Sequence, residues 1–494
     1  MRVEETKRAE LQFIFWIAAN FTICIVYNVE RINELPYDQR PANRKLRHLR
    51  GEYGWPFVGK TLDMFRDPQG LFDHYYRTYG PISRISITGN KCVLLLHPDH
   101  AQRVLMDREK NFSIKMGWES VMADFFQGGL VMRDYDEHRM HRGIMQSSFK
   151  PPAMREYAIR VQGIVERTVE RWAAQDSICF YDEVKRLLLD IAFEVFCWVD
   201  NTESKLPAVN QAFTDMMEGA LGIVRLDVPG FLYHRGLEGR RFLKRFFMDL
   251  IEQKRASNDK DVFAHFCREM TEDGEYYSDE DIADHMAFLM LAAHDTTTSA
   301  STMAAYHLCH DYGLQDELAD EVATWPRELS FEQVFHQVNP MICVFYETLR
   351  MHPPVPLFLR RTIRECEFDG VRVPPDTMVC VPGSYIHRME EWWSEPNAFK
   401  PSRFSEEVSE HRKHNFMWIP FGGGAHKCIG MHFARMLFLL TFRELIGKYQ
   451  IEYAKDGYHP ARLQHFPFTK PVDGLPLRLR QRKTFGSKAV SKRD

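Results

Sequence analysis

A glycine-rich loop that carries a cysteine constrains this chain more than any other feature. The loop reads Phe-Gly-Gly-Gly-Ala-His-Lys-Cys-Ile-Gly over residues 421–430, and an apolar stretch with helical character follows at 431–440. Three consecutive glycines let the backbone turn tightly and come close to a flat, bulky group. Cys428 stands just before the helix, where free N–H groups and the positive end of the helix dipole favour a thiolate. The sequence therefore predicts a thiolate, presented by a tight loop, that is suited to bind iron.

This loop resembles the haem-binding segment of the cytochrome P-450 superfamily, and Cys428 falls at the position of the axial ligand to the iron of haem b. The resemblance implies haem contacts from six loop residues: Phe421, Gly422, Gly424, His426, Cys428 and Gly430. The chain departs from the usual pattern at His426, because most members carry an arginine there that bonds a haem propionate. A protonated histidine also donates to a carboxylate, and the sterol 14-demethylases are similar in having histidine there. We therefore expect haem binding, with an added sensitivity to pH.

The resemblance covers about residues 51–480 and implies one haem-thiolate catalytic unit. Its fold would be mainly α and prism-shaped, with a smaller β-rich part, although a length of 494 residues alone suggests two or three domains. Two hairpins are expected: one joins 82–87 to 92–96, and the other turns at Asp369-Gly370. Helical periodicity dominates from about residue 98 to residue 351, and a loose basic tail is expected at 481–494.

Charge and cysteine usage exclude several classes of protein. A net charge of −4 gives no indication of a nucleic-acid partner. The ten cysteines are scattered singly, without a C-x-x-C pair. This spacing argues against a zinc site and a disulfide framework, and it fits a reducing compartment.

The N-terminal segment 1–30 includes a stretch, 11–29, without a formally charged side chain. Its length is near what a bilayer requires, but its polar residues make it a marginal span. The linker that follows, 31–50, is basic, so the positive-inside bias would leave the catalytic unit on the cytoplasmic side. We expect membrane association through this segment. A helix lying on the membrane surface and a helix packed on the protein are the alternatives.

A long, largely buried helix is expected from residue 279 to about residue 309, with Ser278 as its cap. Its middle reads Ala-Ala-His-Asp-Thr-Thr-Thr over 292–298, where acid and hydroxyl side chains compete for backbone hydrogen bonds. This cluster indicates a local opening that admits water or dioxygen. It also resembles the oxygen-activation motif of the superfamily, which implies that Thr296 holds the activated oxygen and that Asp295 relays protons to it.

Partners for the two haem propionates are expected from two further segments, because buried carboxylates need cationic partners. His138 and Arg142 are four residues apart and share a helix face, and they resemble the family's His/Trp-x-x-x-Arg pair that meets the propionates. Arg360 matches the family's strand arginine at the same haem edge, and the adjacent Arg361 can be confused with it.

A buried ionic network is expected near the haem loop. Glu347 and Arg350 form the family's Glu-x-x-Arg, and Arg403 lies in a segment that resembles its Pro-x-Arg-Phe. A carboxylate shared by two guanidinium groups can be buried because all three are paired. The implied role is structural: the network holds the helix and the loop that leads to Cys428.

The reaction that the resemblance implies is insertion of one oxygen atom from O2 into a lipophilic substrate, by what we expect to be a monomer. Two electrons would come from NAD(P)H through a separate ferredoxin, flavodoxin-like or reductase partner, since the chain carries no flavin or iron–sulfur motif. A basic surface around Lys413, Lys427 and Arg435 is expected to receive an acidic partner.

The substrate class follows from two apolar segments, 118–130 and 216–232, which fall where the family places its substrate-contacting loops. Their Met and Phe content suits a sterol-, terpenoid- or fatty-acid-like ligand. Two alternatives belong to other functional classes: a haem-thiolate isomerase or dehydratase that needs no external electrons, and a non-catalytic haem sensor. The pair Asp295 and Thr296 counts against the first, because enzymes of that kind typically lack it.

Overall fold

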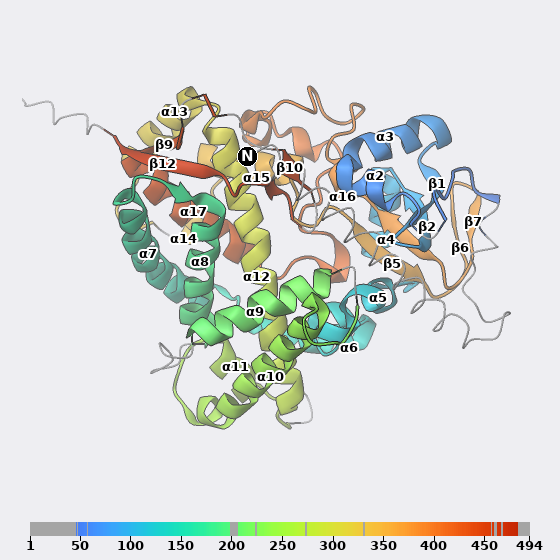
Figure 1. The fold of residues 1–494 in the computed structure, drawn as a ribbon, viewed down its shortest axis with the longest axis horizontal. Helices are drawn as coiled ribbons and strands as arrows, with labels where there is room; N and C mark the ends of the chain where they lie inside the picture. The colour runs from blue at the N-terminus through green and yellow to red at the C-terminus, as the bar shows by residue number, and fades with distance from the viewer. Residues whose placement is uncertain are drawn as a thin grey trace, which may run out of the picture.

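The computed structural model describes residues 46, 48–56, 58–197, 206–222, 225–271, 274–329, 331–455, 457–458, 462–465 and 468–482. Figure 1 shows a large helical part and, beside it, a smaller part built around β1, β2 and β5. This arrangement confirms the predicted fold class, mainly α with a smaller β-rich part. The segment 1–30, most of the linker 31–50 and nearly all of the tail 481–494 lie outside the described residues. Within the described ranges, no helix combines the length and apolar character needed to cross a bilayer.

The α-helices begin where the sequence supplies a capping side chain or a proline. Pro98 and Pro340 open α4 and α15, and the Ser278 hydroxyl accepts from the Asp281 N–H at 3.1 Å to cap α12 as predicted. The described helices are α2 Thr61–Arg66, α3 Pro68–Tyr79, α4 Pro98–Met106, α5 Ile114–Phe126, α6 Tyr135–Ser147, α7 Pro151–Ala173, α8 Phe180–Ala192, α9 Leu206–Leu221, α10 Leu232–Ala256, α11 Val262–Arg268, α12 Asp279–Leu308, α13 Tyr312–Ala323, α14 Phe331–Phe335, α15 Pro340–Met351, α16 Gly383–Ile386 and α17 Met431–Lys448.

The strands are short and form four small sheets. They are β1 Ile82–Ile87, β2 Asn90–Leu95, β3 Phe112–Ser113, β4 Ile178–Cys179, β5 Phe358–Thr362, β6 Cys366–Phe368, β7 Val371–Val373, β8 Met378–Val381, β9 Tyr449–Tyr453, β10 Leu463–Gln464, β11 Lys470–Pro471 and β12 Pro476–Gln481. The largest sheet has the order β1-β2-β8-β5-β3, in which only the β2–β8 pair is parallel. In it, Ser113 of β3 pairs with Arg361 of β5.

Both predicted hairpins are present. β1 pairs with β2 from Ile82 opposite Leu95 to Ile87 opposite Asn90. β6 and β7 are joined by Asp369 and Gly370, whose φ angles are 47° and 79°. Positive φ at both central residues of a two-residue hairpin matches the strand twist, which explains why Asp-Gly is a strong hairpin signal.

The central helix α12 contacts α5, α8, α10, α15 and α17, so it is buried on most sides (Figure 1). Its backbone is helical throughout 292–298, and the local opening for water or dioxygen stays a prediction. The Thr296 hydroxyl donates to Ala292 O at 2.7 Å, and Thr298 donates to His294 O at 2.9 Å. Hydroxyl bonds of this kind share the carbonyl oxygens of the helical ladder, and they often bend a helix slightly.

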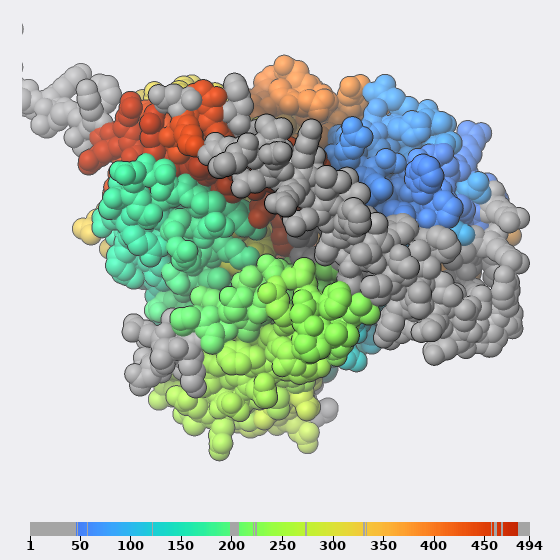
Figure 2. Space-filling model, viewed as in Figure 1, coloured from blue at the N-terminus to red at the C-terminus, as the bar shows by residue number. Residues whose placement is uncertain are grey.

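The haem loop lies where two apolar cores meet. Phe421 packs against the large helical core, whereas Phe416 and Leu105 belong to the core of the β-rich part. On the face drawn in Figure 2, α9 and α10 (bright green) form the lower surface of the helical part. The two helices approach closely because Gly219 and Gly236 face each other, and a Cβ on Gly219 would lie 2.8 Å from the Gly236 Cα.

Candidate haem site

The loop before α17 is held in a tight, glycine-dependent conformation. The Cys428 N–H donates to Phe421 O at 2.9 Å and closes the loop. Gly422 and Gly424 have φ angles of 69° and 64°, which favour glycine. A Cβ on Gly424 would also lie 2.0 Å from Leu105 O, so the loop could not press against the end of α4 with any other residue there.

Two other glycines of the loop differ in what they require. Gly423, which was not among the predicted haem contacts, is buried, and a Cβ on it would lie 2.7 Å from the Phe416 ring. At Gly430, an added Cβ would have no protein atom within 4 Å, so no protein contact requires a glycine at this position. The sequence pattern contains both glycines, but only the fold shows that Gly423 is required by a protein contact and Gly430 is not.

Cys428 differs from the other described cysteines in accessibility. Of nine described cysteines, Cys428 alone is exposed, and all nine are free thiols. Protein nevertheless surrounds enough of the sulfur that desolvation raises the pKa of Cys428, against the opposing effect of the Gly430 N–H, Arg142 and Lys427. The thiolate that we expected from the helix start therefore depends on these opposing effects and stays a prediction. A metal ion would reverse this balance, since a coordinating thiol is deprotonated.

Two histidines and two arginines from three separate segments converge beside this loop. The rings of His138 on α6 and His426 lie with their centroids 3.8 Å apart. Burial is the largest cause that lowers the pKa of His426 to about 2, and His138, Arg360 and Arg142 lower it further. Burial and Arg142 likewise lower the pKa of His138 to about 4. The structure therefore brings together all four residues predicted to meet the propionates.

This cluster has the charge that a haem edge requires. Burial lowers the pKa of Arg360 to about 10, and among the described residues its guanidinium donates one hydrogen bond, to the preceding Leu359 O at 2.9 Å. The two arginines lower the pKa of His426, and both also lower that of His138, so a negative charge between these groups would favour proton binding by the histidines. Two carboxylates would supply it, so these residues fit the propionates of a haem.

The fold also separates Arg360 from Arg361, which the sequence could not do. Arg360 is buried, with 5% of its surface exposed, and faces the cation cluster. Arg361 points away from it and forms an ion pair with Asp376 at 2.7 Å. Adjacent strand residues point to opposite faces of a sheet, which is the physical reason for the difference.

On α12, the predicted proton-relay residue has cationic neighbours. Asp295 is buried, with Lys185 Nζ at 3.4 Å and His294 Nδ1 at 3.3 Å from its Oδ1. Burial alone would raise the pKa of Asp295, but His294 and Lys185 hold it below its ordinary value. The carboxylate is therefore ionised at neutral pH in spite of its burial.

Sequence reasoning missed Lys185. It lies on α8, more than a hundred residues before Asp295, and one lysine on an amphipathic helix carries no sequence signal. Its side chain is 25% exposed, so it reaches from Asp295 toward solvent. A small hollow between α8, α9 and α12 lies beside the pair and is lined by Lys185, Asp295, Phe213, Met217 and Met290, among others.

The ionic network beneath the loop is fully buried. Glu347 accepts from Arg350 Nε at 2.6 Å and Nη2 at 2.8 Å, and from Arg403 Nε at 3.3 Å. The Lys400 N–H donates a fourth hydrogen bond to Glu347 at 2.7 Å. At least one remaining N–H of each arginine donates to main-chain oxygens, those of Pro396 and Glu395, so the charges are compensated.

The expected basic surface needs a correction at one residue. Arg435 is 4% exposed, and its guanidinium donates to Val334 O, Gln337 O and the Tyr346 hydroxyl. It therefore stabilises the interior and cannot meet a partner protein. Its position on α17, whose residues are apolar on nearly every side, explains the burial.

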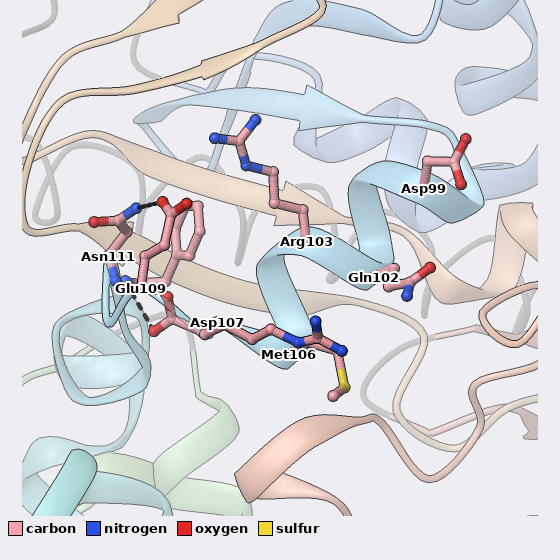
Figure 3. A pocket seen from close by; sticks show the side chains of 9 residues that line it. Asp99, Gln102, Arg103, Met106, Asp107, Glu109 and Asn111 are labelled. Carbon is pink, nitrogen blue, oxygen red and sulfur yellow. Dashed lines mark hydrogen bonds between the residues drawn. The ribbon is translucent and has the colours of Figure 1, made fainter.

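A surface hollow beside α4 holds none of the predicted site residues. Figure 3 shows Asp99, Arg103, Asp107 and Glu109 in its wall, with Asn111 bonded to Glu109 and Asp107. Charges of both signs line it, and they do not converge on one point. We do not regard this hollow as the reaction site.

Comparisons with known proteins agree with this geometry. The family model described as Cytochrome P450 matches residues 49–473. The chain is 34% identical over 453 residues to "Putative cytochrome P450 136" of Mycobacterium tuberculosis, covering 90% of both chains. It is 28% identical to "Abscisic acid 8'-hydroxylase 4" of Arabidopsis thaliana, over 87% of this chain and 92% of the relative. It is 26% identical to "Taxane 13-alpha-hydroxylase" of Taxus cuspidata, with the same coverages.

Among solved structures, the chain is similar to "Retinoic acid bound cyanobacterial CYP120A1". The TM-score is 0.79, with 23% sequence identity, over 87% of this chain and 99% of that one. This match supports the fold.

Proposed function

Because the chain belongs to the cytochrome P450 family, it is a haem monooxygenase, and we propose that its substrate is a lipophilic small molecule of sterol, terpenoid or fatty-acid type. One oxygen atom of O2 enters the substrate and the other leaves as water. The catalytic unit spans about residues 51–480. The observation that carries the proposal is the convergence of two arginines and two histidines beside an accessible cysteine that lies in a glycine loop.

In this proposal the chain holds haem b through residues on both sides of the loop. Cys428 would bind the haem iron, and the donors that would hold the propionates are His138, Arg142, Arg360 and His426. Phe421, Gly422, Gly424 and Gly430 shape the surface against which the ring lies. When bound, haem supplies the activation of dioxygen, and a thiolate ligand favours cleavage of the O–O bond.

The protons for this chemistry come through α12. Asp295 is ionised and buried, so it accepts a proton from the Lys185 side and passes it inward. Thr296 is partly accessible, and its hydroxyl donates to Ala292 O, which leaves its oxygen free to accept a further hydrogen bond. General acid–base steps of this kind typically contribute about 10²–10⁴-fold to a rate.

The proposed substrate class is supported by apolar side chains on α5 and α9 and by the curated relatives. Phe125, Met216 and Phe213 belong to the buried core at this side of α12. Two of the relatives are named for abscisic acid and taxane, which are terpenoid compounds. Lipophilic compounds with few polar groups suit side chains of this kind.

The electrons are proposed to come from NAD(P)H through a separate ferredoxin, flavodoxin-like or reductase partner. Lys427 is exposed beside Cys428. Lys413 forms an ion pair with Glu410 at 3.1 Å and is half exposed. These two lysines, without Arg435, remain the candidates for contact with an acidic partner.

The test uses the absorption of the reduced, CO-bound protein. Cys428→Ala should lose the band characteristic of thiolate-ligated haem, while Cys179→Ala, at a free cysteine on β4, should keep it. A normal thiolate band in Cys428→Ala would overturn the proposal. The substrate class is tested separately, by titrating wild-type protein with sterols, terpenoids and fatty acids and recording the shift of the Soret band from low to high spin.

A further inference from the structure

The Asp134 carboxylate binds the start of a neighbouring helix. Its Oδ2 accepts from the Ser113 hydroxyl, and its Oδ1 accepts from the Ile114 N–H at 2.8 Å and the Lys115 N–H at 3.4 Å. Ile114 and Lys115 are the first residues of α5, whose first N–H groups have no partner within the helix. Ser113 caps the same turn by accepting from the Met116 N–H at 2.9 Å.

The main chain of Asp134 starts a different helix. Asp134 occupies the N-cap position of α6, and its carbonyl accepts from the His138 N–H at 3.1 Å. An aspartate at this position usually bonds N–H groups of its own helix. Here the side chain makes no such bond, because it is committed to α5. One residue therefore joins the helix on the proposed substrate side to the helix that carries His138 and Arg142.

The strand that carries Arg360 meets the same junction. Ser113 pairs with Arg361 across β3 and β5, and α5 lies so close to β5 that a Cβ on Gly117 would be 2.9 Å from the Arg360 Cα. The nearby negative charge of Asp134 offsets part of the burial cost of the Arg360 guanidinium, and Asp107 and Tyr135 add to this effect. Asp107 is visible at the edge of the hollow in Figure 3.

Backbone strain at the next residue indicates how strongly the junction is fixed. Tyr135 has a φ of 47°, an uncommon conformation for a residue other than glycine. Its hydroxyl donates to Phe112 O at 3.1 Å and lies 3.4 Å from Asp107 Oδ2. Such a conformation persists only where the surroundings over-determine it.

We propose that Asp134 is a positioning residue that couples the order of α5 to the placement of the haem-edge residues His138, Arg142 and Arg360. The inference rests on the proposed function, because it assigns those residues to the haem edge. Loss of the carboxylate frees the first turn of α5 and loosens the start of α6 at the same time. Order on the substrate side and retention of haem are thereby linked through a residue that touches neither.

The test compares Asp134→Ala with Asp136→Ala in the full-length holoenzyme. Asp136 lies two residues further along, in the first turn of α6, with 72% of its side chain exposed and only two long ion pairs. Two quantities are measured: hydrogen exchange of the 114–116 amides, and the rate of haem transfer to apomyoglobin. Loss of a helix cap by substitution with alanine corresponds to roughly a tenfold change in an opening equilibrium. We expect about tenfold faster exchange and several-fold faster haem transfer in Asp134→Ala, and neither change in Asp136→Ala.

Two results would overturn the coupling. Exchange equal to that of Asp136→Ala would mean that the carboxylate does not order α5. Faster exchange with unchanged haem transfer would mean that α5 and the cations are independent. If Asp134→Ala fails to fold, Ser113→Ala takes its place. This variant removes only the hydroxyl between Asp134 and the Met116 N–H, and the same amide exchange and haem transfer are measured. A wild-type protein without the thiolate CO band would refute the proposed function. The exchange comparison does not depend on that band, so it would still show whether the Asp134 carboxylate orders α5.

Discussion

The ammonium group of Lys185 on α8 lies 3.4 Å from the buried carboxylate of Asp295 on α12. The lysine is partly exposed and the aspartate is not, so the pair spans the distance between solvent and the middle of the central helix. His294 completes the group, because its Nδ1 lies 3.3 Å from the same carboxylate oxygen and its Nε2 lies 3.0 Å from Lys185 O. The proposed proton donor is therefore held from two sides.

Lys185→Met should raise the pKa of Asp295. Lys185 now opposes the effect of burial, which favours the neutral carboxyl, so its removal shifts the balance toward the protonated form. The apparent acidic pKa in the dependence of product formation on pH should rise. Lys185→Arg keeps the charge and should leave the profile near that of the wild type. A profile that is the same for Met and Arg would show that Lys185 does not act on the proton donor.

Thr296→Ala should separate haem reduction from product formation. Without the Thr296 hydroxyl, the proposed hydrogen-bond acceptor that directs the proton from Asp295 is lost. Reduced dioxygen should therefore leave as hydrogen peroxide. NAD(P)H consumption should continue while product falls by up to about 10²-fold, or by less where water substitutes for the hydroxyl. The measurement is the ratio of product and peroxide to NAD(P)H consumed, with added redox partners.

Thr298→Ala is the matched control for that substitution. Its hydroxyl also donates one turn back, to His294 O at 2.9 Å, but it is fully buried. The control variant should keep the wild-type ratio. If the ratio of product and peroxide to NAD(P)H consumed is unchanged in Thr296→Ala, Thr296 has no role in proton delivery. Thr297 should then be tested.

Glu347→Ala should destabilise the protein and its haem content far more than it changes the chemistry. The substitution leaves the buried Arg350 and Arg403 without their shared carboxylate, a change that typically costs about 3–5 kcal/mol. Circular dichroism melting and the haem-to-protein ratio provide the measurement. Glu365→Ala breaks an exposed pair with Arg372 and should leave both values nearly unchanged. A folded, fully loaded Glu347→Ala protein would contradict the structural role.

Acid should destabilise the protein through its buried histidines. Burial is the largest cause that lowers the pKa of His285, His307 and His387 to about 3 each, from an ordinary value of 6.5. The folded state then binds fewer protons than the unfolded state, so the stability present above pH 6.5 is lost as the pH falls toward about 3. His307→Phe should reduce the difference in melting temperature between pH 7 and pH 5, whereas the exposed His74→Phe should not. An equal pH dependence in both variants would contradict the assignment.

Local sequence determined the elements because their causes are local. The Asp369-Gly370 hairpin, the Ser278 cap of α12 and the start of α4 at Pro98 depend on backbone preferences and hydrogen bonds within a few residues. The glycine loop before α17 is of the same kind, since positive φ at Gly422 and Gly424 is set by residue type. The resemblance of this loop to a known family fixed the fold class as well.

Only the tertiary structure decided which charged residues share a site. Arg360 faces the cation cluster and Arg361 does not, Arg435 is buried, and Lys185 reaches Asp295 across a long sequence separation. At Cys428 the helix start favours a thiolate while the surrounding protein raises the pKa, and the second effect is set by packing. Desolvation and charge–charge interactions depend on distances between segments, and those distances exist only once α6, α8, α12 and β5 have packed together.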